Sequence, residues 1–169
     1  MEATAIKESL SADRWVRVAI LAAGYTLTGI VGLSLAIPPG YATAVWPASG
    51  IALAAVLLWG PRVWPGIAAG SLLVNLAVAF TTAEVAFGFT SFAIAVSIAA
   101  GSTVQALVCA GALRRYVGVA RLFETGPATL AFCGISAATC LVASSWGVAT
   151  LSVAGVATES QFLESWQTW

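Results

Sequence analysis

The feature that most constrains this chain is a series of apolar stretches whose cores contain no charged residue. Their ranges are Val16–Ile37, Trp46–Trp59, Val63–Phe80, Val85–Leu113 and Pro127–Val153. A bilayer core of about 30 Å requires about 20 apolar residues in each spanning helix. The second stretch is short unless residues 41–45 are counted with it. We therefore predict an all-α, polytopic membrane bundle of five spans.

The composition independently favours a membrane protein. Of 169 residues, 60% are hydrophobic and only 8% are charged, and the mean hydropathy is +0.95. Soluble domains carry about 25% charged residues, and a soluble domain of this size cannot bury so many apolar side chains. No linker-like segment interrupts the apolar stretches. We therefore predict one membrane domain over residues 16–169, preceded by a cytoplasmic segment over residues 1–15.

All basic residues fall on one side of this predicted bundle. They are Lys7, Arg14, Arg17, Arg62, Arg114, Arg115 and Arg121. The connections on the other side, residues 38–45, residues 81–84 and the tail after residue 153, contain no lysine or arginine. Basic residues accumulate in cytoplasmic loops, so the N-terminus is predicted inside and the end of the fifth span outside. The first apolar run is too long for a cleaved signal peptide and is predicted to be an anchor.

The tryptophans are distributed as an interfacial belt would place them. Trp15, Trp59 and Trp64 fall at the predicted inner boundary, while Trp46, Trp146, Trp166 and Trp169 fall at or near the outer one. Indole rings favour the boundary between hydrocarbon and water. Their placement supports the five-span topology.

Few residues in the spans are suited to chemistry. Histidine is absent, no ionisable group lies within a span core, and the net charge is zero. Cys109, Cys133 and Cys140 have no companions that complete a metal set, so they are interpreted as small buried hydrophobes. We predict no catalytic site, no metal, no cofactor and no nucleic-acid partner. The lack of intramembrane charge also disfavours an ion-coupled transporter. The outer loop contains Glu84, which is interpreted as a solvated carboxylate.

Two uncharged amides, Asn75 and Gln105, lie inside predicted spans. Each needs a hydrogen-bond partner, because hydrocarbon provides none. They are interpreted either as bonds between helices or as groups that contact a ligand in a central cavity. Small residues at four-residue spacing, Gly66 with Gly70 and Ser97 with Gly101, predict close helix packing and are compatible with a homodimer.

The sequence Trp46-Pro47-Ala48-Ser49-Gly50 opens the second span. Proline is well tolerated in the first turn of a helix, and the exposed N–H groups of such a turn attract anions and carbonyl oxygens. We consider two roles for Pro47, Ser49 and Gly50: contact with an external ligand, or fixing the start and packing of the helix.

A second Trp-Pro pair, Trp64-Pro65, opens the third span four residues after Gly60. The two pairs, together with Gly50, Gly60, Arg62, Gly66 and Asn75, resemble the membrane-associated sensor domain of the first type, of the MASE family. Residues 162–169 also look like the start of a further span in that family. The resemblance covers nearly the whole chain.

The resemblance implies a sensory input domain in a bacterial plasma membrane. Family members are usually fused to a histidine kinase or a cyclic-di-GMP enzyme, which would be the cytoplasmic partner. The sensed molecule or membrane state is not specified by these residues. The family domain has about eight spans, so this one is expected to be incomplete. The alternatives from the residues alone are a small permease for an uncharged solute and a non-catalytic membrane scaffold.

Overall fold

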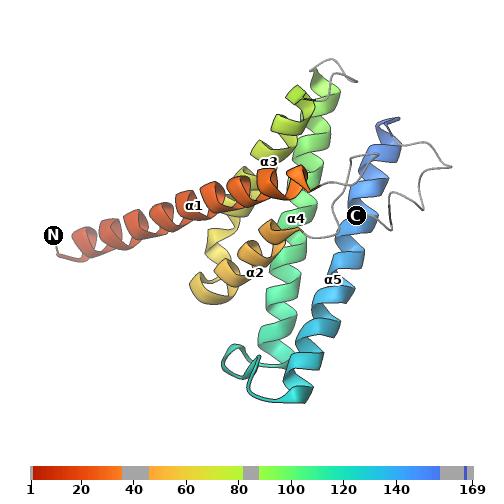
Figure 1. The fold of residues 1–169 in the computed structure, drawn as a ribbon. Coiled ribbons are helices and arrows are strands. Elements are labelled where there is room, and N and C mark those ends of the chain that lie inside the picture. Colours follow the sequence, from red (N-terminus) through yellow and green to blue (C-terminus); the bar gives the residue numbers. More distant parts are fainter. Residues whose placement is uncertain (1, 36–45, 82–87, 157–165, 167–169) are drawn as a thin grey trace.

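A computed structural model of the chain describes residues 2–35, 46–81, 88–156 and 166, with the side chains of residues 2–12 and 81 left aside. These residues form five α-helices and two short 3₁₀ segments, and no strand occurs among them (Figure 1). The elements in chain order are α1 (Glu2–Ser34), α2 (Pro47–Trp59), η1 (Pro61–Val63), α3 (Trp64–Thr81), α4 (Phe89–Tyr116), η2 (Val119–Arg121) and α5 (Gly126–Val153). The all-α prediction is confirmed for this part of the chain.

Four of the five predicted spans have a helix long and apolar enough to cross a membrane. Their apolar segments are Asp13–Ser34, Pro61–Phe80, Phe89–Tyr116 and Gly126–Val153. The second predicted span is different, because α2 has 13 residues and is therefore only about 20 Å long. Residues 41–45, which that prediction needed to lengthen the span, lie outside the described residues, as does Glu84. Helix α1 runs unbroken across the predicted boundary between the cytoplasmic segment, residues 1–15, and the membrane domain that begins at Val16.

The short helix α2 has clear physical boundaries. Pro47 occupies its first turn, where the missing N–H of proline costs nothing because that position has no helical partner. Gly60 ends it with φ of +87°, a conformation that glycine adopts without the clash of a side chain. Pro61 then starts η1, which leads directly into α3. A tight turn thus joins two helices that the sequence separates by four residues.

Helices α1 and α3 lie side by side in parallel. A methyl group placed on Gly66 would come within 2.7 Å of the Val18 carbonyl oxygen, and one on Gly70 would come within 2.7 Å of Tyr25 Cβ. Further along, a methyl group on Gly29 would come within 2.6 Å of Val74 Cγ2. The predicted close approach at Gly66 and Gly70 is confirmed, and its partner is α1.

Helix α4 runs antiparallel to both α3 and α5, the latter at one side of the bundle (Figure 1). Ser71 on α3 donates a hydrogen bond to Ser102 on α4 at 3.3 Å. The α4–α5 pair is joined at several levels, from Ser97 with Thr150 near one end to Cys109 with Ser136 near the other. We call this row of contacts the α4–α5 seam. It contains the predicted small-residue pair Ser97 and Gly101.

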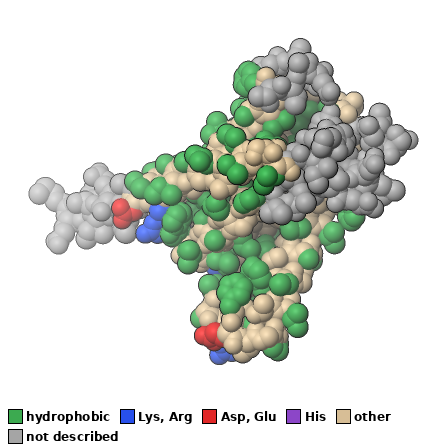
Figure 2. All heavy atoms as spheres, viewed as in Figure 1, with side chains coloured by type: hydrophobic (Ala, Val, Ile, Leu, Met, Phe, Trp, Pro, Cys, Tyr) green, Lys and Arg blue, Asp and Glu red, His purple; other side chains and the backbone are tan. Residues whose placement is uncertain are grey.

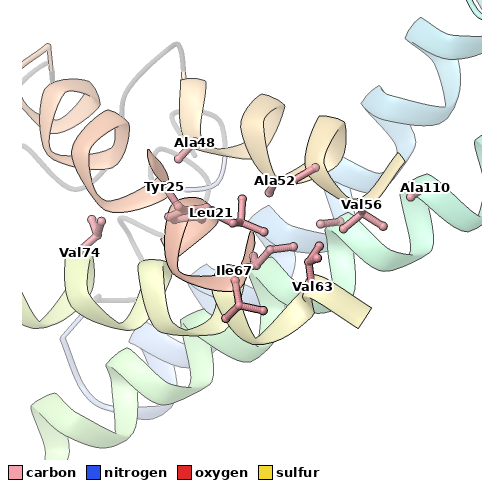
Figure 3. Packing of buried hydrophobic residues seen from close by; sticks show 12 residues of the cluster. Leu21, Tyr25, Ala48, Ala52, Val56, Val63, Ile67, Val74 and Ala110 are labelled. Atoms are coloured by element: carbon pink, nitrogen blue, oxygen red, sulfur yellow. The ribbon is translucent and has the colours of Figure 1, made fainter. Parts of the chain in front are cut away.

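The main core lies between α1, α2, α3 and α4. Its largest fully buried side chains include Tyr25, Leu21, Ile67 and Val56, which point toward one another in Figure 3. Five alanines of α2 and α4 belong to the same cluster, as do valines of α1 and α3. Figure 2 shows hydrophobic side chains spread over the visible surface, with the few charged ones gathered at two places, along α1 and near the connection between α4 and α5. Such a surface suits hydrocarbon surroundings.

Candidate functional site

The first sequence candidate, the start of α2, packs against α1. A methyl group on Gly32 would come within 3.3 Å of the Trp46 ring and 3.5 Å of Pro47 Cδ. The Trp46 indole N–H points to the hydroxyl of Tyr25 at 3.5 Å. Tyr25 is only 1% exposed, so this contact gives its buried hydroxyl a polar neighbour. The motif head is therefore fixed to the middle and end of α1.

The first turn of α2 presents less free backbone than its sequence suggests. The N–H of Ser49 donates to the Trp46 carbonyl at 3.1 Å, and Ala48 is fully buried. Gly50 is exposed, and nothing lies within 4 Å of the position a methyl group would take there. A ligand at this turn would therefore meet the open face of Gly50. The ligand role of Pro47, Ser49 and Gly50 stays a prediction.

The second Trp-Pro pair lies at the opposite end of the bundle. Trp64 is half-exposed, Pro65 is partly buried, and Gly66 packs beside Val18 of α1. Trp46 packs beside Gly32 of the same helix. Those two positions on α1 are separated by about 20 Å along the helix axis at 1.5 Å per residue. The two pairs cannot contact the same small ligand.

The two intramembrane amides have different partners. Asn75 donates from Nδ2 to the Ser71 carbonyl in its own helix at 2.8 Å. Gln105 donates from Nε2 to Cys140 Sγ across the α4–α5 seam at 3.3 Å. The interpretation of Gln105 as a bond between helices matches this geometry. For Asn75 the contact with a ligand and the bond between helices both stay predictions.

A cluster of polar contacts lies on the α4–α5 seam between the first half of α4 and the last two turns of α5. It was not predicted as a site. The Trp146 indole donates to the Ser97 carbonyl at 3.0 Å and to its hydroxyl at 3.2 Å. The Ser97 and Thr150 hydroxyls are 2.9 Å apart. The sequence signal was the small-residue pair Ser97 and Gly101. It indicated close packing without indicating Trp146 as the partner.

Arg114 is a second residue whose role the sequence did not reveal. Its guanidinium donates to the carbonyls of Val56 at 2.7 Å and Leu57 at 3.0 Å. These carbonyls lie in the last turn of α2, where a helix carries partial negative charge; the Val56 carbonyl also accepts from the Gly60 amide. Arg114 thus caps α2 from the end of α4. Its place at a loop boundary in the sequence gave no indication of this contact.

The assembled groups are hydroxyls, amides, indoles and one arginine. Within the described ranges no three His, Cys, Asp or Glu side chains are close enough to hold a metal ion. Hydroxyls and amides can orient an uncharged group by hydrogen bonding. They also join helices, and every such contact named above does so or stays within one helix. The arrangement is that of a bundle whose helices meet at a few polar points.

One of the comparisons with known proteins identifies a family. The family model MASE1 matches residues 16–169, nearly the whole chain. Neither the curated proteins nor the solved structures contain a significant match. The matched range includes α1 from Val16 onward, all of α3, α4 and α5, both Trp-Pro pairs and the α4–α5 seam.

Proposed function

Because the chain belongs to the MASE1 family of membrane sensor domains, we propose that it is the sensory input part of a bacterial signalling protein. In this role it responds to a small molecule or to the state of the membrane, and it passes the response to a histidine kinase or a cyclic-di-GMP enzyme in the cytoplasm. The observation that carries the proposal is the family match over residues 16–169. MASE1 domains are themselves non-catalytic.

The proposal includes an orientation in the plasma membrane. The turn between α2 and α3 contains Arg62, while the last turn of α4 and the connection to α5 contain Arg114, Arg115 and Arg121. Positive charge in short loops favours the cytoplasmic side, so these connections face the cytoplasm in the proposal. The start of α2 and the ends of α3 and α5 then face outward, where an external signal arrives.

Signalling requires two packings of the bundle that a stimulus favours unequally. The α4–α5 seam is suited to this, because α5 packs mainly on α4 through small residues and hydrogen bonds. Hydrogen bonds between membrane helices contribute only about 0.6 kcal/mol each. A shift of α5 against α4 would therefore cost little. Arg114 links the end of α4 to α2, so such a shift would also reach α2.

The proposal is tested in the chromosomal gene. We would delete codons 16–153 in one strain and introduce Gly101→Leu in a second, since a side chain at Gly101 collides with Trp146. The matched control is Gly111→Leu on the same helix, where nothing lies within 4 Å of an added methyl group. The readouts are cellular cyclic-di-GMP, phosphorylation of response regulators and membrane abundance of the protein.

If the chain is a sensor, we expect the deletion and Gly101→Leu to change cellular cyclic-di-GMP or the phosphorylation of response regulators. Gly111→Leu at equal abundance should change neither. Uptake of radiolabelled glycerol, an uncharged solute, should be the same in all strains. Unchanged signalling in the deletion strain would contradict the proposal. A loss of glycerol uptake in that strain would favour the permease instead.

A further inference from the structure

A groove runs between the end of α5 and the beginning of α4 and is separate from the Trp-Pro motifs. Its walls come from the first turns of α4, beginning with Thr90, and from the last turns of α5, ending with Ala154. Its volume is about 470 Å³, within the range of about 300–1,000 Å³ that ligand sites occupy. Since Thr90 and Ala154 lie at helix ends, the groove begins at the membrane boundary and leads inward.

Small side chains leave the groove open. Ala93 on α4 and Ala149 on α5 both line it and are both exposed. Deeper in the seam the space closes, because the Trp146 ring lies against Gly101. The indole thus forms the inner end of the groove, and Ile94 adds an aliphatic wall.

The polar atoms at the inner end are already engaged with one another. Trp146 donates to Ser97, the Ser97 and Thr150 hydroxyls are in contact, and Thr150 donates to the Trp146 carbonyl at 2.8 Å. A polar ligand would have to break these bonds to gain its own. A hydrocarbon chain needs no hydrogen bond and loses nothing there.

The environment of α4 and α5 indicates which hydrocarbon can enter the groove. Both helices are apolar over 28 residues, long enough to cross a membrane, so the open side of the groove faces acyl chains. We propose that the groove binds one acyl chain of a membrane phospholipid, whose glycerol end lies at the level of Thr90 and Ala154. A phospholipid fits better than a soluble amphiphile, because its chain starts at that boundary and points inward. The idea that this binding acts as the input to a sensor rests on the function proposed above, whereas the binding itself does not depend on that function.

The test uses the full chain in nanodiscs of phosphatidylethanolamine and phosphatidylglycerol. The probe is a phosphatidylethanolamine with a photoreactive diazirine in one acyl chain, added at rising mole fraction, and labelled peptides are mapped by mass spectrometry. Ala149→Phe fills the groove from α5 and Ala93→Phe fills it from α4. The matched control is Ala137→Phe, also exposed on α5 but outside the groove.

We expect labelling at the groove to saturate at low mole fraction, to be lost in both groove-filling variants and to persist in Ala137→Phe. Labelling elsewhere on α5, for example near Leu130, should rise in proportion to the probe. Groove labelling that also rises in proportion, or that survives both filling variants, would overturn the proposal. Saturable labelling by a free diazirine fatty acid but not by the phospholipid would overturn it too. None of these outcomes depends on the signalling readouts, so the two proposals fail independently.

Discussion

The ring of Trp146 lies directly on Gly101, so that a methyl group at Gly101 would come within 2.8 Å of Trp146 Cδ1. The indole N–H is fixed at the same time by the backbone and hydroxyl of Ser97. The Trp146 ring is therefore fixed on α4 in two ways. It packs where Gly101 has no side chain, and its N–H bonds to Ser97 one turn away. This contact sets the separation of the two helices.

The first prediction concerns that contact. We expect Gly101→Ala to destabilise the protein by about 1–3 kcal/mol, since an overpacked interface must shift. The change is measured as the free energy of unfolding in mild detergent. Gly111→Ala is the matched control on the same helix, with nothing within 4 Å of the added methyl group. There alanine should be neutral or stabilise by up to about 1 kcal/mol through its helix propensity. Equal effects at the two positions would contradict the structure.

The second prediction concerns α1 and α3. A methyl group on Gly70 would come within 2.7 Å of Tyr25 Cβ and 3.0 Å of the Ala22 carbonyl oxygen. Neither atom is the end of a flexible side chain, so the helices must separate. We expect Gly70→Ala to lower the unfolding free energy by about 1–3 kcal/mol. Gly134→Ala, in open space on α5, should not lower it.

The third prediction concerns Arg114. Replacing it by glutamine removes the positive charge from the C-terminal turn of α2, an interaction of about 1 kcal/mol at an exposed site. The backbone amide of Gly60, which donates to the Val56 carbonyl, should then exchange with deuterium about fivefold faster. Arg115→Gln is the control, because Arg115 stacks on its neighbour Tyr116 at 6.0 Å. Faster exchange in the Arg115 variant alone would refute the cap.

The fourth prediction separates the two bonds of the Trp146 indole. Ser97→Ala removes the hydroxyl, with its contacts to Trp146 and Thr150, but keeps the backbone acceptor at 3.0 Å. At about 0.6 kcal/mol for each lost bond, it should cost no more than about 1.2 kcal/mol. Trp146→Phe removes the donor and part of the ring, and it should cost more than Ser97→Ala. The comparison is made by unfolding in the same detergent. A larger loss for Ser97→Ala would show that its contact with Thr150 dominates.

The sequence predicted the all-α class, the four long apolar helices and the close approach at Gly66 and Gly70, because length, charge and small-residue spacing are local properties. It did not predict which helix packs against which face. Trp146 was expected in an interfacial belt, which stays a prediction. The packing of its ring on Gly101 was not predicted, because that contact depends on a helix distant in sequence. Arg114 was predicted only as loop charge, since nothing near it in the chain indicates the end of α2. The length of α2 was ambiguous because Trp46-Pro47 fixes where the helix starts, while the sequence before it is also apolar.

The fifth prediction tests the orientation that places the acyl-chain groove and the start of α2 at the outer face. Alkaline phosphatase, which is active only outside the cytoplasm, is fused in turn after Gly40, Gly118 and Gly155. Arg114, Arg115 and Arg121 surround the second of these positions, and no lysine or arginine lies in the connections that contain the other two. The positive-inside rule therefore predicts activity after Gly40 and Gly155 and none after Gly118. A cytoplasmic reporter such as green fluorescent protein should give the reverse pattern. If Gly40 were inside while Gly118 stayed inside, α1 and α3 would cross in opposite directions, which would contradict the parallel packing of Val18 beside Gly66 and Gly29 beside Val74. Activity after Gly118 would reverse the bundle and move both sites to the cytoplasmic face.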